Sequence, residues 1–530
     1  MTEILQPLSG ASSSFAGICT NNQIYVDKTD LICRMAQGRN KYFLARPRRF
    51  GKSLLVTTLA ELFAGNMVLF EKFKAKDLWH DRAYAVVRVD IGTLKKVASA
   101  EELQTRLNDK IIEWFSPVGF SFDADAPIGA LDQLDYWLST LAPSSLVVLV
   151  DEYDAPLTDK INDPALFEKL QAVLSSFFYL FKSNDKCLRF FFMTGITKFR
   201  NTGIFSELND LDDISLWEEY GTLLGYTESE IKTYFGGYLR RAATTLEMST
   251  EKLLCAMRRQ YDGFCFEETC THHVYAPWSV QKFLESPQRG LRNYWYDSAG
   301  QSAALMKYLA VHRLAELDKF EKEVVLSYDD LNGSQELMHL NQEAIMAQTG
   351  YLTLKSVTPN QYFYLGSPNE EVAQSLVRLF SEQIIPEKSI LARMWALPRV
   401  METGSLDEMV EDYFNPVFLG LDYLSYPVAN EAACRVLLQV LLEGAALLPR
   451  SEVHNAKGRS DLEVSVGKRH WVFELKFVKT ASEEAAALSE AIKQMEDRHY
   501  GESTARNREL CRAALVFNGE EKRFTRWQTL

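Results

Sequence analysis

Cysteine is scarce in this sequence, and no Cys-x-x-Cys pair occurs among the eight cysteines of 530 residues. This spacing excludes a small disulfide-stapled domain and indicates a reducing compartment. Residues Met1–Pro7 include an acidic side chain and lack the apolar core of a secretory signal. The longest apolar run, Val436–Leu448, contains Gln439 and Glu443 and is too short and too polar to cross a bilayer. We therefore expect a cytoplasmic protein without membrane contact.

An excess of positive charge is also lacking. The chain has 58 Lys and Arg against 71 Asp and Glu, a net charge of −13. This excludes a chain-wide field that attracts nucleic acid or anionic membranes, so any nucleic-acid contact must be a local patch. No repeat of 20 to 50 residues and no low-complexity tract is present. Since 47% of the residues are apolar, the length predicts about three to four domains with cores of their own.

Short apolar runs rich in β-branched and aromatic residues alternate with helical patterns between about residues 20 and 217. Strands that alternate with helices predict an α/β domain with a mostly parallel sheet. The predicted strands are Lys41–Ala45, Ala85–Asp90, Leu146–Asp151 and Leu188–Thr194.

The pattern changes after residue 217. From about 218 to 400 it is chiefly helical, as in Glu228–Leu239 and Glu251–Tyr261, with a hairpin expected near Tyr351–Tyr364. These features predict a mostly helical middle region that carries a small antiparallel element.

The C-terminal part has a third pattern. Prolines punctuate the chain before it, after which we expect a helix at about 430–446, a hairpin at 461–478 and a helix at 483–498. These elements predict a compact α/β end piece. We therefore expect three domains, comprising residues 1–217, 218–400 and 401–530.

The segment Lys41–Ser53 has the layout of a P-loop: an apolar strand, a loop that ends in Gly51-Lys52-Ser53, and a helix that begins at Leu54. In such a loop, backbone N–H groups at the helix N-terminus cradle phosphate, Lys52 supplies charge for the β- and γ-phosphates, and the Ser53 hydroxyl ligates Mg²⁺. Arg46 stands where the first glycine is expected, so the first bend must be made differently. A Gly-Lys-Ser triplet also occurs by chance at surface turns, so the interpretation depends on context.

Two later strands supply that context. The run Ser145–Val150 delivers Asp151 and Glu152 to the carboxyl edge of the predicted sheet, which faces the ligand crevice in an open α/β fold. We expect Asp151 to hold Mg²⁺ and Glu152 to orient and deprotonate the attacking water. Thr194 ends the next strand, where a γ-phosphate sensor would lie. The alternative is a solvated acidic loop, but the three features together favour an ATP site.

A hairpin near the C-terminus carries a second set of candidates. A two-residue turn at Gly467-Lys468 pairs residues whose numbers sum to 935, which places Asp461 opposite Glu474. Lys476 shares that face of the strand. Because like charges placed opposite each other are unfavourable, the pair predicts a bound Mg²⁺ or Mn²⁺, which activates water for phosphodiester cleavage beside the lysine. The alternative is a solvated hairpin face.

Further side chains are weaker candidates. Glu431 precedes the apolar-periodic helical run Ala432–Leu448, and Gln494 lies in the helix after the hairpin, so each is expected either at the same site or on an exposed helix face. Arg200, Arg240 and Arg241 are candidates for arginine fingers toward a neighbouring nucleotide, and the commoner explanation for each is a surface arginine.

Taken together, these motifs resemble the bacterial family that joins an AAA-ATPase-like domain to a C-terminal PD-(D/E)XK nuclease-like domain. The resemblance spans nearly the whole chain, and in that family arginine also replaces the first P-loop glycine. Its marks are Tyr25–Asp30, Arg46–Ser53, Asp151–Asp154, Thr194–Lys198, Tyr261–Phe266, Ala276–Ser279, Gly350–Thr353, Gly458–Asp461 and Glu474–Lys476.

The resemblance implies an α/β P-loop ATPase domain of the AAA-like type, a mostly helical middle and a restriction-endonuclease-like α/β domain. It implies metal and hydrolysis roles for Asp151 and Glu152. Nuclease roles are implied for Glu431, Asp461, Glu474, Lys476 and Gln494. Nucleotide contacts are expected at Arg46, Pro47, Arg48, Arg49, Phe50, Gly51, Lys52, Ser53 and Leu54.

Three functions follow as hypotheses. The first is an enzyme in which ATP binding or hydrolysis licenses metal-dependent cleavage of nucleic acid, DNA above all. The second is a nucleotide-switched sensor or interaction protein whose nuclease-like end binds without cutting, and the third is an ATPase with a spent C-terminal domain. A homo-oligomer is compatible with the resemblance, because AAA-like domains often form rings. A local DNA patch would require Arg459, Lys468, Arg469, Lys476 and Lys479 to cluster beside the carboxylates.

Overall fold

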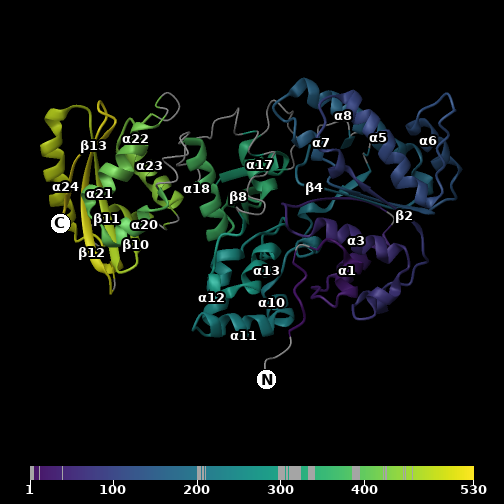
Figure 1. Cartoon of the computed structure of the whole chain (residues 1–530), viewed down its shortest axis with the longest axis horizontal. Helices are drawn as coiled ribbons and strands as arrows, with labels where there is room; N and C mark the ends of the chain where they lie inside the picture. The colour runs from purple at the N-terminus through teal and green to yellow at the C-terminus, as the bar shows by residue number, and fades with distance from the viewer. Residues whose placement is uncertain are drawn as a thin grey trace. The chain divides into compact units, whose positions relative to one another are not determined.

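The computed structural model shows two compact units (Figure 1), one built from the described residues up to 373 and the other from those after 373. The division into domains 1–217, 218–400 and 401–530 stays a prediction. The structure describes residues 5–530 except 11, 39, 200–203, 206–207, 209, 296–304, 306–307, 309–323, 332–340, 385–393, 422, 424–426, 446, 448, 456–457 and 506.

The first unit contains a five-stranded parallel sheet with the order β2-β3-β4-β1-β5. The four strands expected from the sequence are confirmed, and β4 separates the loop strand β1 from β3, which carries the acidic pair. Every residue of β1 is buried, as is usual for a parallel strand covered on both faces. The strands are β1 (Lys41–Ala45), β2 (Ala85–Asp90), β3 (Leu146–Asp151), β4 (Leu188–Gly195) and β5 (Leu211–Asp213).

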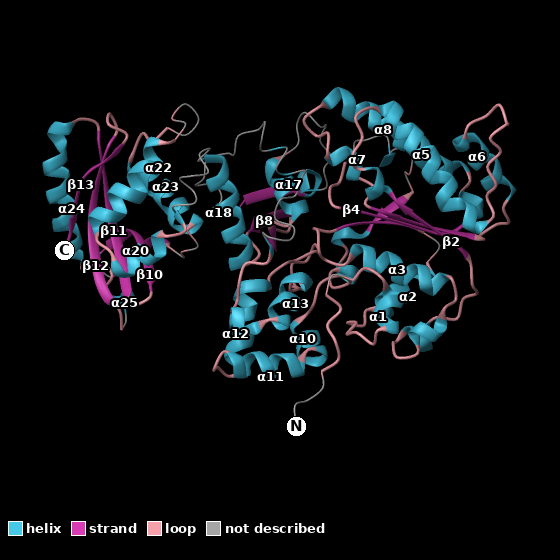
Figure 2. Ribbon diagram, in the orientation of Figure 1, coloured by secondary structure: helices cyan, strands magenta, loops and turns pink. Residues whose placement is uncertain are grey.

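Helices cover both faces of this sheet (Figure 2). One group lies on the side of the N-terminal helices, and the other contains the long helix that follows the acidic pair. The first group is α1 (Phe15–Thr20), α2 (Thr29–Gln37) and α3 (Lys52–Phe63). The second is α5 (Ala100–Phe115), α6 (Ala130–Thr140), α7 (Ala155–Thr158) and α8 (Pro164–Ser183).

The remainder of the first unit is mostly helical. The helices are α10 (Glu228–Tyr234), α11 (Gly236–Thr245), α12 (Thr250–Tyr261), α13 (Pro277–Glu285), α16 (Tyr328–Leu331) and α17 (Gln342–Thr349). The expected helix over 228–239 is two helices, because Phe235 leaves the helical conformation between them. Ile24 and Val26 of the N-terminal segment join the apolar core of α10 to α13. The expected hairpin is present in a three-stranded antiparallel sheet of β6 (Val324–Ser327), β8 (Tyr362–Gly366) and β7 (Thr353–Val357).

The second unit is built on a five-stranded sheet with the order β13-β12-β11-β10-β9. Only the β11–β12 pair is parallel. The strands are β9 (Arg450–Asn455), β10 (Gly458–Val466), β11 (Arg469–Val478), β12 (Glu509–Asn518) and β13 (Arg523–Thr529). The helices are α18 (Glu370–Ile384), which the first unit begins, then α20 (Leu397–Thr403), α21 (Leu406–Glu408), α22 (Asn415–Leu419), α23 (Glu431–Gly444), α24 (Glu484–Arg498) and α25 (Glu502–Ala505).

The two faces of this second sheet have different cores. Helix α24 packs on one face through Ala491 and Met495, which contact Val472 of β11. On the other face, Phe473 contacts Phe414, and the indole of Trp471 donates a hydrogen bond to the Met401 carbonyl. The alternation expected along β11 is confirmed, and it leaves the even-numbered residues from His470 to Lys476 on the face of α24.

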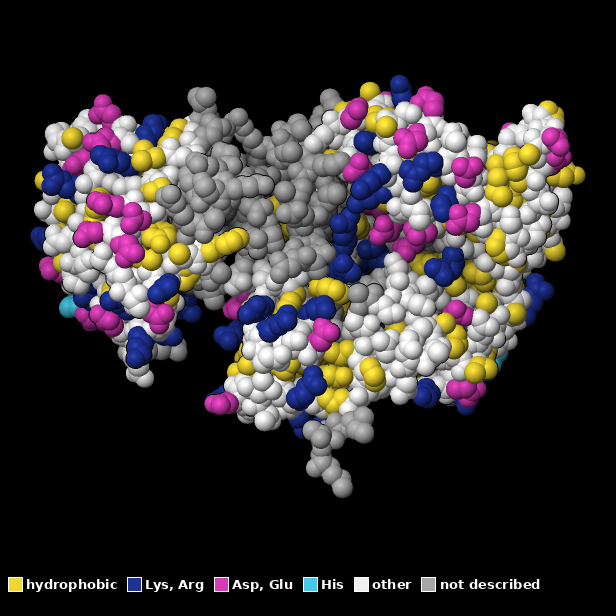
Figure 3. All heavy atoms as spheres, viewed as in Figure 1, with side chains coloured by type: hydrophobic (Ala, Val, Ile, Leu, Met, Phe, Trp, Pro, Cys, Tyr) yellow, Lys and Arg dark blue, Asp and Glu magenta, His cyan; other side chains and the backbone are white. Residues whose placement is uncertain are grey.

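In the part of the chain that the structure describes, no helix combines the length and the apolar character that a membrane span requires. On the surface visible in Figure 3, basic and acidic side chains are interspersed over each unit. The visible face therefore has no large area of exclusively basic side chains among the described residues.

Candidate functional site

The P-loop follows β1 directly and ends where α3 begins. Gly51 caps the helix with a φ of 97°, in the left-handed region that glycine adopts at little cost. The first turn of α3 leaves backbone N–H groups without helical partners, and such a helix N-terminus binds phosphate readily. Local sequence thus explains the turn into the helix.

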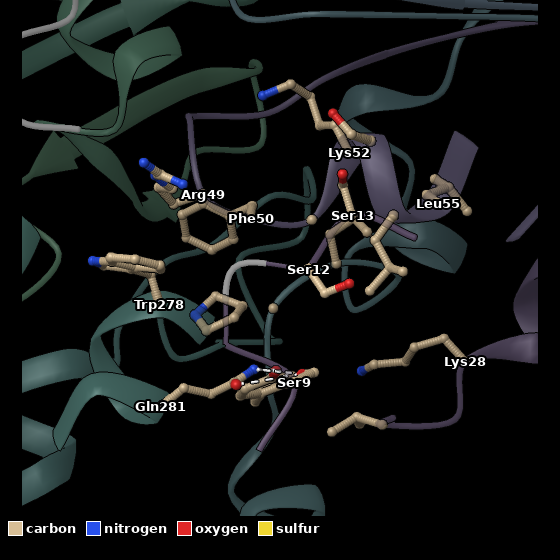
Figure 4. Close-up of a pocket in the computed structure, with 18 of the residues that line it drawn as sticks. Ser9, Ser12, Ser13, Lys28, Arg49, Phe50, Lys52, Leu55, Trp278 and Gln281 are labelled. Atoms are coloured by element: carbon tan, nitrogen blue, oxygen red, sulfur yellow. Dashed lines mark hydrogen bonds between the residues drawn. The ribbon is translucent and has the colours of Figure 1, made fainter. Parts of the chain in front are cut away.

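A cavity of about 530 Å³ opens at this loop (Figure 4), a volume typical of small-molecule sites. Arg48–Leu54 and Glu152 line it. Arg46 and Pro47 do not, and instead border a second cavity of about 60 Å³. The structure therefore brings most of the expected nucleotide residues to one cavity.

Lys52 is the first residue of α3, and its side chain reaches back to the loop. Its Nζ donates hydrogen bonds to the carbonyl oxygens of Arg46 at 2.8 Å and Pro47 at 3.0 Å. Burial lowers the pKa of this amine to about 8, while the nearby carboxylates Asp151, Glu152 and Asp154 oppose the shift. A phosphate would give this buried ammonium the anionic partner that the loop carbonyls replace only in part.

The acidic pair lies at the end of β3, as expected. The Thr194 hydroxyl donates a hydrogen bond of 2.6 Å to Asp151 Oδ1, which also accepts one from the Glu152 N–H at 3.1 Å. Glu152 has a φ of 51°, a strained value for a residue with a side chain, of the kind that clusters at functional sites. Burial raises the pKa of its carboxyl group, with Lys52 opposing the shift. A Cβ added at Gly92 would lie 2.6 Å from Glu152 Oε2, so the absence of a side chain at Gly92 makes room for this carboxylate.

Residues that sequence reasoning gave no role complete the cavity wall. Gln281 accepts a hydrogen bond from the Gly10 N–H at 2.6 Å and donates one to the Tyr226 hydroxyl at 2.7 Å. Trp278 stacks against the Arg49 guanidinium, 4.6 Å from the ring centre (Figure 4). Ala276–Ser279 is one of the sequence motifs, and the fold places its Trp278 beside the P-loop.

Arg46, in the position of the missing glycine, is buried in the protein. Its guanidinium donates to the carbonyl oxygens of Ala45 at 2.9 Å, Ser215 at 2.7 Å and Tyr220 at 3.2 Å. It also lies 4.5 Å from the centre of the Phe266 ring. The side chain therefore ties the loop to the segments that follow β5, and its predicted contact with nucleotide stays a prediction.

The second candidate site lies on the α24 face of the C-terminal hairpin. The ladder pairs Leu462 with Phe473 and Val466 with Arg469, which is the predicted register. Asp461 lies one step beyond the last pair, and its Oδ2 accepts a hydrogen bond of 2.7 Å from the Leu475 N–H. The carboxylate thus leans toward the strand that carries Glu474 and Lys476.

Lys476 is the point at which the expected polar groups converge. Its Nζ lies 3.6 Å from Glu474 Oε1 and 3.8 Å from Glu431 Oε2, and donates a hydrogen bond of 3.1 Å to Gln494 Oε1. Glu431 and Gln494 therefore reach the site from α23 and α24. Glu490, one turn before Gln494, lies 3.9 Å away and was missed, although its spacing of four residues on the same helix could have indicated it.

The electrostatics of this site favour a cation. Burial, followed by repulsion from Asp461, raises the pKa of Glu474 to about 8, and burial also raises the pKa of Asp461. Glu474 Oε2 is buried and has no hydrogen-bond partner among the residues that the structure describes, and a metal ion or a proton would satisfy this acceptor. Within the described ranges, no group of three or more His, Cys, Asp or Glu side chains is arranged to hold a metal, so the protein would offer two carboxylates.

The basic residues considered for a DNA patch do not form one cluster. Lys468 and Arg469 lie at the turn, seven or more residues along β11 from Lys476, which is roughly 23 Å in an extended strand. The Arg469 guanidinium donates to the Gly404 carbonyl at 2.8 Å. Arg459, by contrast, is close enough to lower the pKa of Asp461.

Comparisons with known proteins match the two parts of the chain in which these candidate sites lie. Residues 10–205 match the family model described as a predicted AAA-ATPase, and residues 429–527 match the PD-(D/E)XK nuclease superfamily. A relative, the "Uncharacterized protein in vnfD 5'region" of Azotobacter chroococcum mcd 1, is 28% identical over 494 residues, covering 90% of this chain and 89% of its own.

Among solved structures, the chain aligns with one from "Structure of Drosophila ORC bound to AT-rich DNA and Cdc6" at 13% identity, covering 68% of this chain and 93% of that one. The TM-score of 0.20 is too low to indicate a shared fold. The chain therefore carries a domain of the predicted AAA-ATPase family near its N-terminus and a domain of the PD-(D/E)XK nuclease superfamily at its C-terminal end.

Proposed function

We propose that this protein binds and hydrolyses ATP in its first unit, and that this event controls a Mg²⁺- or Mn²⁺-dependent nuclease in its second unit, with DNA as the substrate. In this proposal, Lys52 and the P-loop amides hold the phosphates, and Ser53 and Asp151 hold Mg²⁺. Glu152 positions and deprotonates water, and Thr194 senses the γ-phosphate through Asp151.

One observation carries the nuclease half of the proposal. Beside Asp461, Glu474 buries its Oε2 without a hydrogen bond to any described residue, while its Oε1 lies 3.6 Å from the Lys476 ammonium. An uncompensated buried acceptor costs about 1–3 kcal/mol, so the arrangement favours a ligand. Asp461 and Glu474 would hold a divalent cation, which supplies Lewis-acid stabilisation of a phosphodiester.

The other groups of the site have separate roles in the proposal. Lys476 positions the attacking water and the scissile phosphate by charge. Gln494 and Glu431 orient that ammonium, since both lie within about 4 Å of it. Arg459 provides a local contact to the nucleic-acid backbone, and such contacts weaken steeply with salt.

The proposal is tested with purified protein on supercoiled plasmid and on labelled single-stranded DNA. We expect nicking with Mg²⁺ or Mn²⁺, and a dependence of its rate on ATP. The variants Asp461→Ala and Lys476→Ala should lose cleavage, while Glu509→Gln, at the other end of the sheet, should keep it. Cleavage that survives in both site variants would show that a contaminant or another site is responsible.

A second candidate function has a specific observation in its favour. Asp461 Oδ2 is already engaged by the Leu475 N–H, and the described residues contain no three-ligand metal group. These facts favour a nucleotide-switched sensor whose nuclease-like domain grips DNA without cutting it. In that case Lys52→Ala should change DNA affinity, while Glu474→Ala should change neither affinity nor the response to ATP.

A further inference from the structure

The three arginines of the P-loop have three different environments. Arg46 is buried and donates to three carbonyl oxygens. Arg49 is exposed and stacks on Trp278. Arg48 is half-buried and lines the same cavity as Lys52 and Glu152. Of these three arginines, Arg48 is therefore the one that lines the cavity and whose guanidinium is not already engaged by another described residue.

Arg48 has no hydrogen bond or ion pair with any residue that the structure describes, although its charge acts on both neighbours that matter for hydrolysis. It helps to lower the pKa of Lys52 and opposes the rise in the pKa of Glu152. A partly buried guanidinium is costly without an anionic partner, and its planar donors match phosphate oxygens. The cavity thus holds a cation near both the P-loop lysine and Glu152, where it can contact a bound anion.

We propose that Arg48 is a catalytic residue that contacts the γ-phosphate of the nucleotide bound in its own chain and stabilises the charge of the transferring phosphoryl group. This inference rests on the proposed ATP hydrolysis and deepens it. It places the function of an arginine finger in cis, within the P-loop itself, so that hydrolysis requires no arginine from a neighbouring subunit.

The step conserves atoms and charge. The oxygen of water bonds to the γ-phosphorus, and the bond from that phosphorus to the β,γ-bridging oxygen breaks with its electron pair retained by ADP. The water proton passes to Glu152 and then to solvent. Arg48 takes no part in the proton transfer and acts by electrostatic stabilisation of the phosphoryl oxygens.

Other cations of the first unit are less suited. The Arg241 guanidinium donates a hydrogen bond to the Leu284 carbonyl at 2.8 Å and stacks over the Tyr238 ring. Arg240 is already engaged in another interaction. Arg200 lies outside the described residues. Of the other described cations that line the cavity, Lys28 forms an ion pair with Glu230 and Arg49 stacks on Trp278. Lys95 lines the cavity beyond the end of β2, so the experiment must separate it from Arg48.

The test compares Arg48→Ala, Arg48→Lys and Lys95→Ala with wild type, measuring kcat for ATP and the Kd values for ATP and for ADP with aluminium fluoride. We expect Arg48→Ala to lower kcat on the order of a thousandfold and to leave the Kd for ATP within about tenfold. Affinity for the aluminium fluoride complex, which mimics the transferring group, should fall far more than affinity for ATP. Arg34→Ala, an exposed arginine paired with Glu219, is the matched control and should leave all three values unchanged.

A mixing experiment separates cis from trans action. Arg48→Ala and Lys52→Ala are each inactive in the proposal, and their mixture should stay inactive because both groups serve the same nucleotide. Recovery of activity on mixing would assign Arg48 to a neighbour's site and overturn the proposal.

The outcomes also separate this inference from the proposed function. If wild type hydrolyses ATP and Arg48→Ala does so equally well, or if only Lys95→Ala is impaired, the role of Arg48 is overturned and the ATPase stands. If wild type neither binds nor hydrolyses ATP, both proposals fail.

Discussion

The hydroxyl of Thr194 donates a hydrogen bond of 2.6 Å to Asp151, which joins the ends of two neighbouring parallel strands. Strand β4 lies between β3 and the P-loop strand β1, so a residue at its end reaches the acidic pair and the loop together. The proposed role of Thr194 as a γ-phosphate sensor rests on this bond, because it couples the position of Asp151 to the end of β4.

The first prediction concerns this bond. Thr194→Val removes the donor while keeping the shape of the side chain, so the free energy of unfolding should fall by about 1 kcal/mol. ATP hydrolysis should fall about tenfold with ATP affinity changed little, because the bond positions Asp151 without holding the nucleotide. Thr197→Val, which removes the similar bond to Asp154, is the control: it should cost comparable stability and leave kcat near wild type. Equal kcat values in the two variants would contradict the sensor role.

The second prediction concerns the acid pair of the nuclease-like domain. Without metal at pH 8.5, Glu474→Gln should melt several degrees above wild type, because the neutral amide removes the repulsion from Asp461 and the cost of burying a charge. Mn²⁺ should raise the melting temperature of wild type and not that of the variant. Thermal melts with and without Mn²⁺ test both the higher melting temperature of the variant and the loss of its Mn²⁺ shift. Glu509→Gln is the control and should respond like wild type. An equal Mn²⁺ shift in Glu474→Gln would show that the cation binds elsewhere.

The third prediction concerns Arg46. Replacing it by glycine, the residue usual at this P-loop position, should lower the free energy of unfolding by several kcal/mol, because three buried carbonyl oxygens lose a charged donor and a void is left. ATP affinity should not improve. Denaturant unfolding and nucleotide titration check the two parts, and a variant of wild-type stability would contradict the structural role.

The fourth prediction concerns Glu371, a fully buried carboxyl group at the start of α18. It accepts hydrogen bonds from the Ser279 hydroxyl at 2.8 Å and from the N–H groups of Tyr294 at 2.6 Å and Trp295 at 2.9 Å. Burial raises its pKa to about 8, above the ordinary value of 4.5. The folded state therefore binds more protons than the unfolded state between these values, so its contribution to stability is complete below pH 4.5 and is lost as the pH rises through 8.

Glu371→Gln keeps an acceptor and removes the titration. The difference in unfolding free energy between wild type and this variant should change by about 1.4 kcal/mol per pH unit across that window, in favour of the variant at high pH. Denaturant melts at pH 5.5, 6.5 and 7.5 measure the slope. Parallel stability curves for the two proteins would contradict the raised pKa.

Much of the fold was predictable because its signals are local. The apolar runs that end at Ala45, Asp90, Asp151 and Thr194 are short, bounded by polar residues and separated by helical patterns, and each became a strand of the parallel sheet. The hairpin register followed from one glycine at the turn, since a two-residue loop leaves a single pairing.

Other features could not be read from the sequence because they depend on contacts between distant segments. Trp278 and Gln281 meet the P-loop only after α13 folds back against it. Arg46 is buried because its guanidinium donates hydrogen bonds to carbonyl oxygens about 170 residues away in the sequence. The basic residues of the hairpin were close in sequence, but the extended strand separates the turn from Lys476.

The sequence by itself determined the elements and the chemistry they carry: a phosphate loop, an acidic strand end and a hairpin whose register sets Asp461 near Glu474. Short-range rules suffice there, because turn geometry and side-chain alternation act over a few residues. Only the tertiary structure decided which of the three P-loop arginines lines the cavity without a partner among the described residues, and that Glu431, Glu490 and Gln494 converge on Lys476. The burial and the electrostatic environment of a site depend on segments that are distant in the sequence, so local sequence patterns cannot predict them.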